Sequence, residues 1–263
     1  MKTHIVIPAR YNSSRLPGKP LLKMNGHSMI FHVYQRALEA AADTVCVATD
    51  DRRVFEEVES FGGKVVMTDS QHQSGTDRLA EVASIHKFGE DDIVVNLQGD
   101  EPLIPPSFID TLSEELRFNS SADIVTLACQ ISSVSSTFNP NIVKVVCDDI
   151  GKALYFSRAP IPWDRATFHQ GKKSSPEQHG SYAQGYLRHI GLYAYKVNQL
   201  KKLSAAPVSF LEHLESLEQL RALSLGMSIF VKKIQGGPPH GVDTLKDYER
   251  VKLIMETNNE AFR

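Results

Sequence analysis

The sequence has few cysteines and no long apolar run. Its 263 residues contain three cysteines, an odd number, and no CxxC pair of the kind that holds zinc. Cys46, Cys129 and Cys147 lie in apolar contexts, which predicts buried and reduced thiols. No apolar run approaches the ~18 residues of a membrane span, and no cleavable leader is visible. We therefore expect a cytoplasmic protein without membrane insertion.

The sequence also lacks a net charge and two well-known phosphate motifs. Its 29 Lys and Arg residues against 31 Asp and Glu residues give a net charge of −2. No overall field therefore attracts nucleic acid as a partner. Neither GxxxxGK[ST] nor GxGxxG is present, and the second absence disfavours an NAD-dependent dehydrogenase. A phosphate site in this chain has to be built from local basic groups.

A basic loop follows the first apolar segment, in the stretch IVIPARYNSSRLPGKPL. The β-branched residues 5–7 predict a buried strand, which Pro8 ends because proline donates no hydrogen bond to a sheet. Ligands of open α/β sheets bind at the carboxyl ends of the strands. The loop there carries serine hydroxyls and three cations suited to a polyphosphate: Ser13, Arg10, Arg15 and Lys19. The alternative interpretation is a solvated basic surface loop.

Strand and helix patterns alternate along the chain. Predicted strands are residues 5–7, 44–48, 64–67, 92–97, 124–129, 142–146, 153–156, 188–195 and 228–234; predicted helices are residues 29–41, 54–61, 79–86, 105–117, 210–225 and 245–255. This order predicts an α/β fold with a mostly parallel central sheet flanked by helices. The length fits a single domain over residues 1–263. Residues 132–136 are predicted to form a polar loop.

A second polar loop, QHQSGTDR, precedes the predicted helix at residues 79–86. Ser74 and Thr76 are good helix-start residues, and free amides at a helix amino terminus attract phosphate or a polar base edge. Arg78 adds a cation. The alternative is a plain capping segment with a solvated arginine. Asp50 follows the predicted strand 44–48. It either caps the predicted helix 54–61 or faces the ligand, and capping is the favoured interpretation.

Two aspartates are candidate metal ligands. Asp100 follows the buried strand 92–97 in the segment QGDEP, where Gly99 lets the backbone come close to a ligand. Asp243 lies in GGPPHGVDT before the last helix. A divalent cation bound to phosphate oxygens needs one or two carboxylates, so this pair suits Mg²⁺. The alternatives are a turn-forming role for Asp100 and a helix-capping role for Asp243.

Several segments together resemble one enzyme family. These are PARYNSSRLPGKPL from residue 8, SGTDRLAEV at 74–82, NLQGDEPLIP at 96–105, ALYFSRAPIPWDR at 153–165, RHIGLYAY at 188–195, LEHLESLEQLRAL at 211–223 and GVDT at 241–244. They resemble, in the same order, the CMP-Kdo synthetases, cytidylyltransferases that activate 3-deoxy-manno-octulosonate (Kdo). The resemblance covers nearly the whole chain. It implies a Rossmann-like nucleotidyltransferase fold and a homodimer, with residues 155–195 as a substrate-lining and dimerisation excursion.

The resemblance also implies a reaction. The anomeric C2 hydroxyl of a 3-deoxy-2-keto sugar acid attacks the α-phosphorus of CTP and gives a CMP-sugar and pyrophosphate, for use in lipopolysaccharide biosynthesis. The implied nucleotide-binding residues are Arg10, Ser13, Arg15, Lys19, Ser74, Arg78 and Gln98. The implied sugar-binding residues are Gln98, Arg158, His189, Tyr193 and Glu212. Arg10, Lys19, Asp100 and Asp243 are the implied catalytic residues, and the last two hold Mg²⁺.

For the sugar-binding residues the sequence leaves structural alternatives open. Arg158 suits a carboxylate of the substrate or a structural ion pair. The alternation in RHIGLYAY places His189 and Tyr193 on one face, which lines a sugar site or forms a half-buried strand. Glu212 lies in the first turn of the predicted helix 210–225, where it accepts sugar hydroxyls or complements the helix dipole.

Other functions and substrates stay open at this point. A sugar 1-phosphate nucleotidyltransferase is expected to have a second cationic pocket, and a glycosyltransferase an Asp-x-Asp in place of QGDEP. A non-catalytic nucleotide-binding regulator needs no second metal carboxylate. The octulosonate is Kdo or a variant such as the 8-amino form. His240 stands where members of the family often have a neutral residue, and the basis of cytosine selectivity is left open.

Overall fold

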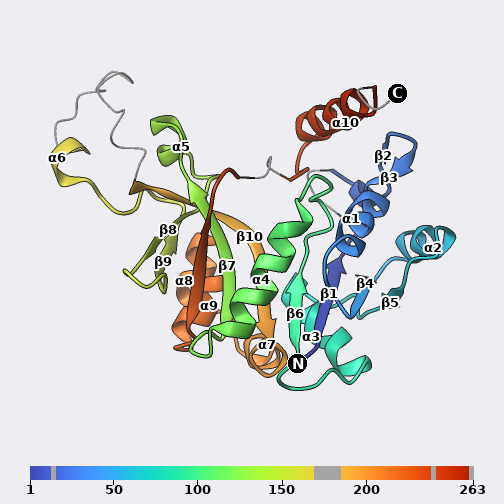
Figure 1. The fold of residues 1–263 in the computed structure, drawn as a ribbon, viewed down its shortest axis with the longest axis horizontal. Helices are drawn as coiled ribbons and strands as arrows, with labels where there is room; N and C mark the ends of the chain where they lie inside the picture. The colour runs from blue at the N-terminus through green and yellow to red at the C-terminus, as the bar shows by residue number, and fades with distance from the viewer. Residues whose placement is uncertain (13–15, 169–184, 238–240, 261–263) are drawn as a thin grey trace. The chain divides into compact units, whose positions relative to one another are not determined.

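A computed structural model describes residues 1–12, 16–168, 185–237 and 241–260 (Figure 1). The chain divides into two compact units. The first unit comprises Met1–Arg117, Leu192–Ala205 and Pro238–Arg263, and the second comprises Phe118–Gly191 and Ala206–Gly237. The single domain predicted over residues 1–263 stays a prediction, because two compact units of one chain can still unfold as one cooperative domain.

The first unit is built on a parallel sheet. Its strands are β1 (Thr3–Pro8), β4 (Thr44–Thr49), β5 (Val65–Met67) and β6 (Ile93–Asn96), and the second half of β10 (Leu187–Lys196) pairs antiparallel with β6. β1 pairs in parallel with both β4 and β6, and β5 pairs in parallel with β4. Residues 5–7 are fully buried. The predicted mixed α/β fold with a mostly parallel sheet is confirmed, and Pro8 is the last residue of β1.

Helices connect these strands. They are α1 (Met29–Leu38), α2 (Arg52–Ser60), α3 (Gly75–Ile85), α4 (Pro106–Phe118), α7 (Val197–Ala205) and α10 (Leu245–Glu260). All but α7 were expected from the apolar periodicity. The 3₁₀ helix η1 (Lys19–Leu21) and the short strands β2 (Lys23–Met24) and β3 (His27–Ser28) were also not predicted. Asn25 and Gly26 join β2 to β3 with φ values of 48° and 83°, and Asn-Gly is typical of such a turn.

The second unit combines parallel and antiparallel strands. β7 (Ile124–Gln130) pairs in parallel with β11 (Ile229–Ile234), and β8 (Lys144–Cys147) pairs antiparallel with β9 (Ala153–Ser157) and with the first half of β10. Its helices are α5 (Val134–Phe138), α6 (Arg165–Phe168), α8 (Phe210–Glu215) and α9 (Gln219–Ser224). The polar loop predicted at 132–136 is therefore wrong in part, because Ser133 caps α5 by accepting from the backbone amide of Ser136.

The single helix predicted over residues 210–225 is wrong. Ser216 adopts a left-handed conformation with φ 50° and separates α8 from α9. The leucines on the two sides of the break differ in burial: Leu214 is 62% exposed, whereas Leu220 is fully buried. Apolar periodicity could not reveal this break, because leucines recur at helical spacing on both sides of Ser216.

The three thiols are free, as predicted. Cys46 and Cys129 are buried and Cys147 is half-buried. Burial raises the pKa of Cys46 to about 12 and that of Cys147 to about 11, so both thiols are protonated and unreactive at neutral pH.

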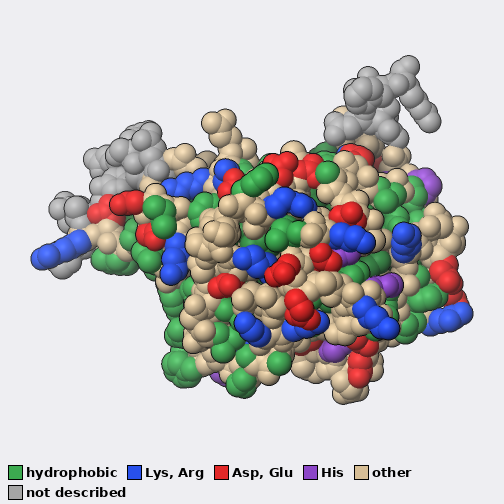
Figure 2. Space-filling view, turned by 60° about the horizontal axis from the view of Figure 1, so that its bottom comes forward, with side chains coloured by type: hydrophobic (Ala, Val, Ile, Leu, Met, Phe, Trp, Pro, Cys, Tyr) green, Lys and Arg blue, Asp and Glu red, His purple; other side chains and the backbone are tan. Residues whose placement is uncertain are grey.

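The surface carries both signs of charge. On the face drawn in Figure 2, basic and acidic side chains are interspersed among the described residues. This mixture agrees with the small net charge of the sequence. Within the described part of the chain, no helix is long and apolar enough to cross a membrane. The predicted excursion at 155–195 includes residues 169–184, which lie outside the described residues, and its role stays a prediction.

Candidate active site

Lys19 lies between the two predicted metal ligands in the first unit. Its Nζ donates to Asp100 Oδ2 at 2.6 Å and to Asp243 Oδ1 at 3.4 Å. The side chain of Lys19 is 14% exposed, that of Asp100 25% and that of Asp243 46%, so the ion pairs are partly shielded from water. Three residues up to 224 positions apart in sequence thus form one charged cluster. The positions of Lys19 and Asp100 after strand ends led us to expect that these two lie close together.

The loop that presents Lys19 is closed by a glycine. Gly18 has a left-handed φ of 70°, and its backbone amide donates to the carbonyl of Tyr11 at 3.0 Å. A Cβ at Gly18 would lie 3.3 Å from the ring of Tyr11 and would also strain this backbone. Pro20 then supplies a favourable residue for the first turn of η1. The local sequence therefore returns the chain to the sheet edge with Lys19 at the start of η1.

The two aspartates are joined through their backbones. The amide of Val242 donates to the carbonyl of Asp100 at 2.9 Å, which connects the GVDT segment to the QGDEP segment. A Cβ at Gly99 would lie 2.9 Å from the carbonyl oxygen of Pro8, and one at Gly241 would lie 3.1 Å from that of Asp100. Glycine at these two positions permits the close approach that brings Asp100 and Asp243 to the same place.

The donor chemistry of this cluster fits magnesium. Mg²⁺ is usually held by one or two carboxylates, with water and substrate phosphates completing its shell. Asp100 and Asp243 offer two carboxylates, and the ammonium group that bridges them marks a position where positive charge is favourable. Within the described residues, no group of three or more His, Cys, Asp and Glu is placed to hold a metal ion. Magnesium stays a prediction, in which the substrate supplies the remaining ligands.

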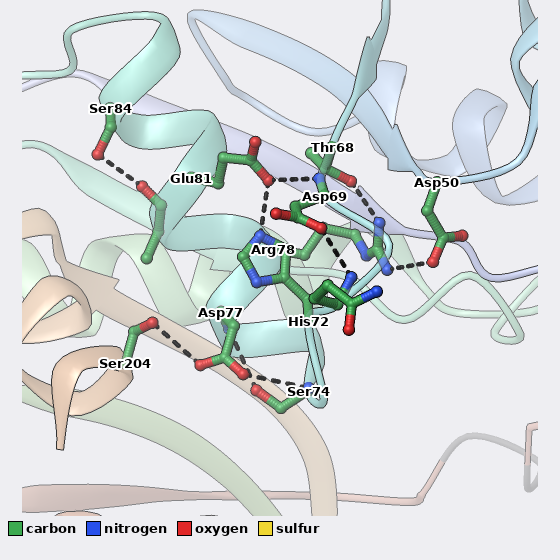
Figure 3. Close-up of polar contacts among 12 residues, drawn as sticks. Asp50, Thr68, Asp69, His72, Ser74, Asp77, Arg78, Glu81, Ser84 and Ser204 are labelled. Carbon is green, nitrogen blue, oxygen red and sulfur yellow. Dashed lines mark hydrogen bonds and ion pairs between the residues drawn. The ribbon is translucent and has the colours of Figure 1, made fainter. Parts of the chain in front are cut away.

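Arg10 links the basic loop to the second polar loop. Its Nη2 donates to the backbone carbonyl of His72 at 2.7 Å. His72 Nε2 lies 2.6 Å from Glu81 Oε2 on α3 (Figure 3). The basic loop and residues 71–78 are therefore adjacent. The other two predicted residues of the basic loop, Ser13 and Arg15, lie outside the described residues, as does His240.

Ser74 caps α3, as predicted. Its Oγ accepts from the amide of Asp77 at 3.1 Å, and the Asp77 carboxylate accepts from the amide of Ser74 at 3.2 Å (Figure 3). Asp77 also accepts from Ser204 Oγ at 3.0 Å. The spacing of serine and an acidic residue three positions later was the available signal for this capping box. The Ser74 hydroxyl therefore already accepts a hydrogen bond within the first turn of α3.

The amino terminus of α3 retains capacity for a ligand. Thr76 is 1% exposed, and its Oγ1 has no hydrogen-bond partner among the described residues. A Cβ at Gly75 would lie 3.5 Å from Pro8 Cγ, so this helix terminus abuts the end of β1. Free amides at a helix amino terminus attract anions and polar base edges. A buried hydroxyl without a partner normally costs free energy, which a ligand atom would relieve.

Arg78 is buried and has structural partners. The guanidinium donates to Thr68 Oγ1 and, at 2.8 Å, to Asp50 Oδ2 (Figure 3). The alternative of a solvated arginine is wrong, because Arg78 is 0% exposed. The favoured capping role of Asp50 is also wrong, since Asp51 caps α2 by accepting from the amide of Arg53 at 3.0 Å. A nucleotide contact for Arg78 stays a prediction.

Gln98 and Tyr193 both adjoin Asn96 at the end of β6. Gln98 Nε2 donates to Asn96 Oδ1 at 3.2 Å. Tyr193 is the residue of β10 that faces Asn96 in the antiparallel register. Its ring stacks on Tyr195 with centroids 5.7 Å apart, which confirms that alternate residues of this segment share a face. These two candidates for sugar binding therefore lie in the first unit, at the edge where Asp100 follows β6.

In the second unit, Arg158 is held by backbone carbonyls. Its side chain donates to the carbonyl oxygens of Glu215 at 2.7 Å, Pro140 at 3.0 Å and Ser216 at 3.3 Å. Its own amide donates to the Glu215 carboxylate at 2.8 Å. The structural alternative for Arg158 is therefore supported, with carbonyls in place of the expected ion-pair partner. A contact with a sugar carboxylate stays a prediction.

His189 is a neutral imidazole in this fold. Burial lowers its pKa to about 3. Its Nε2 lies 3.0 Å from Thr126 Oγ1, and the Thr126 hydroxyl donates to the carbonyl of Ile190 at 3.1 Å. With the threonine proton directed to that carbonyl, Nε2–H of His189 is the donor to Thr126. Phe156 packs against the imidazole edge-to-face at 5.0 Å. A sugar contact of His189 stays a prediction.

Glu212 forms a buried ion pair that the sequence did not indicate. Its two oxygens accept from Arg221 Nε at 2.8 Å and Nη2 at 2.6 Å. Glu212 also accepts from the amide of Ser209 at 3.2 Å and completes the capping box of α8. Both partners are buried. The helix-start alternative for Glu212 is thus supported, and its contact with sugar hydroxyls stays a prediction.

Comparison with known proteins places the chain in a family. The family described as Cytidylyltransferase matches residues 4–232. The 3-deoxy-manno-octulosonate cytidylyltransferases of Hahella chejuensis and Tolumonas auensis are 50% and 51% identical to this chain, each match covering 95% of this chain and 96% of the relative.

Solved structures agree with this assignment. A CMP:2-keto-3-deoxy-manno-octonic acid synthetase complexed with CTP is 44% identical, with a TM-score of 0.86 over 98% of this chain and 100% of that chain. A 4-diphosphocytidyl-2C-methyl-D-erythritol synthase, 14% identical with a TM-score of 0.61 over 97% and 98% of the two chains, shares the fold alone. The resemblance seen in the sequence motifs is confirmed. The chain belongs to the 3-deoxy-manno-octulosonate cytidylyltransferase family.

Proposed function

We propose that this chain transfers the cytidylyl group of CTP to the anomeric C2 hydroxyl of Kdo, giving CMP-Kdo and pyrophosphate. The observation that carries the proposal is the cluster of Lys19, Asp100 and Asp243 beyond the ends of β1 and β6. Membership of the family supports the reaction, and the relative complexed with CTP supports the nucleotide. The product is the activated form of Kdo used in lipopolysaccharide biosynthesis.

The chemistry is a direct in-line displacement. The C2 oxygen of Kdo forms a bond to the α-phosphorus while the bond from that phosphorus to the bridging oxygen breaks, and pyrophosphate leaves with the electron pair. Such a transfer depends on positioning and on neutralising charge, without a covalent intermediate on the protein. Lys19 and Arg10 hold the β- and γ-phosphates and the departing pyrophosphate, with Arg15 as a third predicted cation.

Asp100 and Asp243 would hold magnesium. When bound, the ion supplies positive charge to the triphosphate and lowers the pKa of the attacking hydroxyl. The backbone bond from Val242 to Asp100 keeps the two carboxylates together before any ligand arrives. Lys19 neutralises both in the meantime and offers its ammonium group to phosphate oxygens when the nucleotide enters.

The nucleotide and the sugar use different neighbours of this cluster. The amides at the start of α3 and the buried Thr76 Oγ1 suit a polar edge of the nucleotide. Gln98 and Tyr193, which adjoin Asn96, offer an amide and a phenol to a polyhydroxylated sugar acid. The roles proposed for Arg158, His189 and Glu212 in sugar binding rest on the resemblance to the family.

We also propose a cytoplasmic homodimer. The three free thiols support a reducing compartment. In the second unit, α8 exposes apolar side chains that include Phe210, 73% exposed, and Leu214, 62% exposed, and such residues favour a contact with another chain. Sedimentation or light scattering of the purified protein tests this state: a mass of twice the chain supports it, and a monomer at micromolar concentration contradicts it.

Pyrophosphate release tests the reaction. The assay contains the enzyme, CTP, Mg²⁺ and Kdo, and parallel reactions replace CTP with UTP or Kdo with N-acetylneuraminate or 8-amino-Kdo. Release with CTP and Kdo, and much less with the replacements, is expected. Release with 8-amino-Kdo in preference to Kdo would change the substrate within the same reaction. CTP binding without release from any of the sugar acids would contradict the proposal and favour a nucleotide-binding regulator.

A further inference from the structure

The charged cluster rests on one apolar cluster. Each of the three segments that carry the charges contributes a residue to it: Leu16 precedes Lys19 by three positions, Leu103 follows Asp100 by three, and Val242 directly precedes Asp243. The full cluster, which we name the platform, consists of Met24, Met29, Val242 and Val251 with Leu16, Leu103, Tyr248 and Met255 packed against it. The position of each charge therefore depends on how the platform is packed.

Helix α10 supplies three of the platform residues and begins two positions after Asp243. Its first turn is fixed by a reciprocal cap. The amide and Oγ1 of Thr244 donate to Asp247 Oδ2 at 3.0 and 2.8 Å, and the amide of Asp247 donates to Thr244 Oγ1 at 3.2 Å. The backbone of Asp243 is thus continuous with a helix start of defined geometry. A shift of α10 would move Asp243 with it.

Tyr248 joins α10 to the segment that carries Lys19. Its hydroxyl donates to the backbone carbonyl of Lys23 at 2.6 Å. Lys23 is the first residue of β2, two positions after the end of η1. Apolar contacts in the platform are non-directional, whereas a hydrogen bond of this length requires one orientation of donor and acceptor. This bond therefore selects one placement of α10 on β2 among those that the apolar contacts allow.

Asp243 is the carboxylate that depends most on this placement. Its distance of 3.4 Å to Lys19 is the longer of the two ion-pair distances, and its side chain is 46% exposed against 25% for Asp100. Asp100 directly continues the loop after the buried strand β6, whereas Asp243 lies between Val242, whose amide donates to the Asp100 carbonyl, and the start of α10. The placement of Asp243 therefore depends on α10 as well as on the Val242 bond.

We propose that Tyr248 is a positioning residue for the transfer reaction: through its bond to the Lys23 carbonyl it fixes α10 and sets Asp243 at the distance from Lys19 and Asp100 that metal binding requires. The inference rests on the proposed function, because it assigns the two carboxylates to a divalent cation. It concerns a residue that touches neither substrate nor metal.

The test compares Tyr248→Phe with Tyr34→Phe. Tyr34 lies on α1 in the same unit, and its hydroxyl accepts from the backbone amide of Lys64 at 3.0 Å. Each variant keeps its ring and loses one hydrogen bond between a tyrosine hydroxyl and the backbone, so both should lower the Tm by a similar few degrees. Only Tyr248→Phe changes a bond that leads to the charged cluster.

The first measurement is binding of Mn²⁺, as a spectroscopic substitute for magnesium, in the presence of CTP and without the sugar acid. The Kd for Mn²⁺ is expected to rise about threefold to tenfold in Tyr248→Phe, the range of one lost hydrogen bond, and to stay unchanged in Tyr34→Phe. In turnover, the half-saturating Mg²⁺ concentration should rise by a similar factor in Tyr248→Phe alone, while the KM for the sugar acid stays at the wild-type value.

Equal Mn²⁺ affinity in the two variants and the wild type would overturn the proposal. Loss of the folded state in Tyr248→Phe would overturn it as well, because the hydroxyl would then serve stability. The failure of the proposed function is separate: a wild type that binds CTP and Mn²⁺ but releases no pyrophosphate contradicts the reaction, while weaker Mn²⁺ binding by Tyr248→Phe would still support the positioning role.

Discussion

The charged cluster of the first unit and the charged residues of the second unit differ in how far their ion pairs are exposed to water. Lys19 at the start of η1 pairs with the loop residues Asp100 and Asp243, and all three side chains are partly exposed. Glu212 is buried against Arg221 at a helix start. A partly exposed ion can exchange its partner for a ligand at small cost, whereas a buried ion that loses its partner costs several kcal/mol.

This contrast shows that residue type and place in the sequence do not by themselves identify a binding residue. The partners of a side chain decide whether it is available to a substrate. The following predictions separate the two regions, and they run from the largest expected change in free energy at neutral pH to the smallest.

Glu212→Gln is expected to lower the free energy of unfolding by up to about 3–5 kcal/mol, because buried Arg221 loses its two-point contact with the Glu212 carboxylate and keeps Glu218 as an acidic partner at 3.7 Å. Chemical denaturation measures it. Glu56→Gln is the control, since Glu56 pairs with Arg52 at 2.8 Å on the surface and an exposed pair contributes little to stability. Unchanged stability in Glu212→Gln together with a raised KM for Kdo would move Glu212 from the structural group to the substrate contacts.

Asp100→Asn is expected to reduce magnesium-dependent turnover more than tenfold, which exceeds ~1.4 kcal/mol of transition-state stabilisation, and to leave the Tm near that of the wild type. The reason is that the amide keeps the size of the side chain and removes its charge. Asp149→Asn, at an exposed position of the second unit, is the matched control. Wild-type turnover in Asp100→Asn would remove this carboxylate from the metal site.

Lys19→Ala is expected to weaken CTP binding and turnover by at least tenfold, or about 1.4 kcal/mol, because the ammonium group is lost both for the phosphates and for the carboxylate pair. Calorimetric titration of CTP and initial rates measure the two effects. Lys23→Ala is the control, since Lys23 has its ammonium group on an exposed pair with Glu57. Near-normal kinetics in Lys19→Ala would exclude the basic loop from the site.

His189→Asn is expected to have a small effect on stability at neutral pH and a larger one in acid. Burial lowers the pKa of His189 from 6.5 to about 3, so the unfolded chain binds a proton between these values and the folded chain does not. Stability from this group is present above pH 6.5 and falls by up to about 1.4 kcal/mol per pH unit as the pH decreases toward 3. Urea unfolding at several pH values should show a shallower fall in the variant. A parallel fall in both proteins would show that His189 titrates normally.

The order of strands predicted that Lys19 and Asp100 lie near each other, whereas the place of Asp243 was implied only by the resemblance to the family. Parallel strands end at one sheet edge, so Lys19 after β1 and Asp100 after β6 had to be neighbours once both strands were recognised. The capping role of Ser74 followed from a local motif. These inferences required only the order of elements and short-range patterns.

The ion-pair partners of buried side chains could not be predicted from the sequence in the same way. Arg78 finds Asp50, 28 positions away, and Glu212 finds Arg221 across the break at Ser216. Sequence patterns show that such side chains are charged, but the choice between a ligand and a buried partner depends on tertiary packing. The interpretation of residues 210–225 as one helix was wrong for this reason, since a left-handed residue and an ion pair across it replace the expected continuous turn.

The most direct test of the central claim, that Asp100 and Asp243 serve one site, is a double-mutant cycle on kcat/KM for CTP. The rates of Asp100→Asn, Asp243→Asn and the double variant are compared with the wild type at saturating Kdo and magnesium. If the two carboxylates act together, the double variant should be little slower than the slower single variant. If the two losses multiply, the carboxylates act independently and the single-site account is wrong.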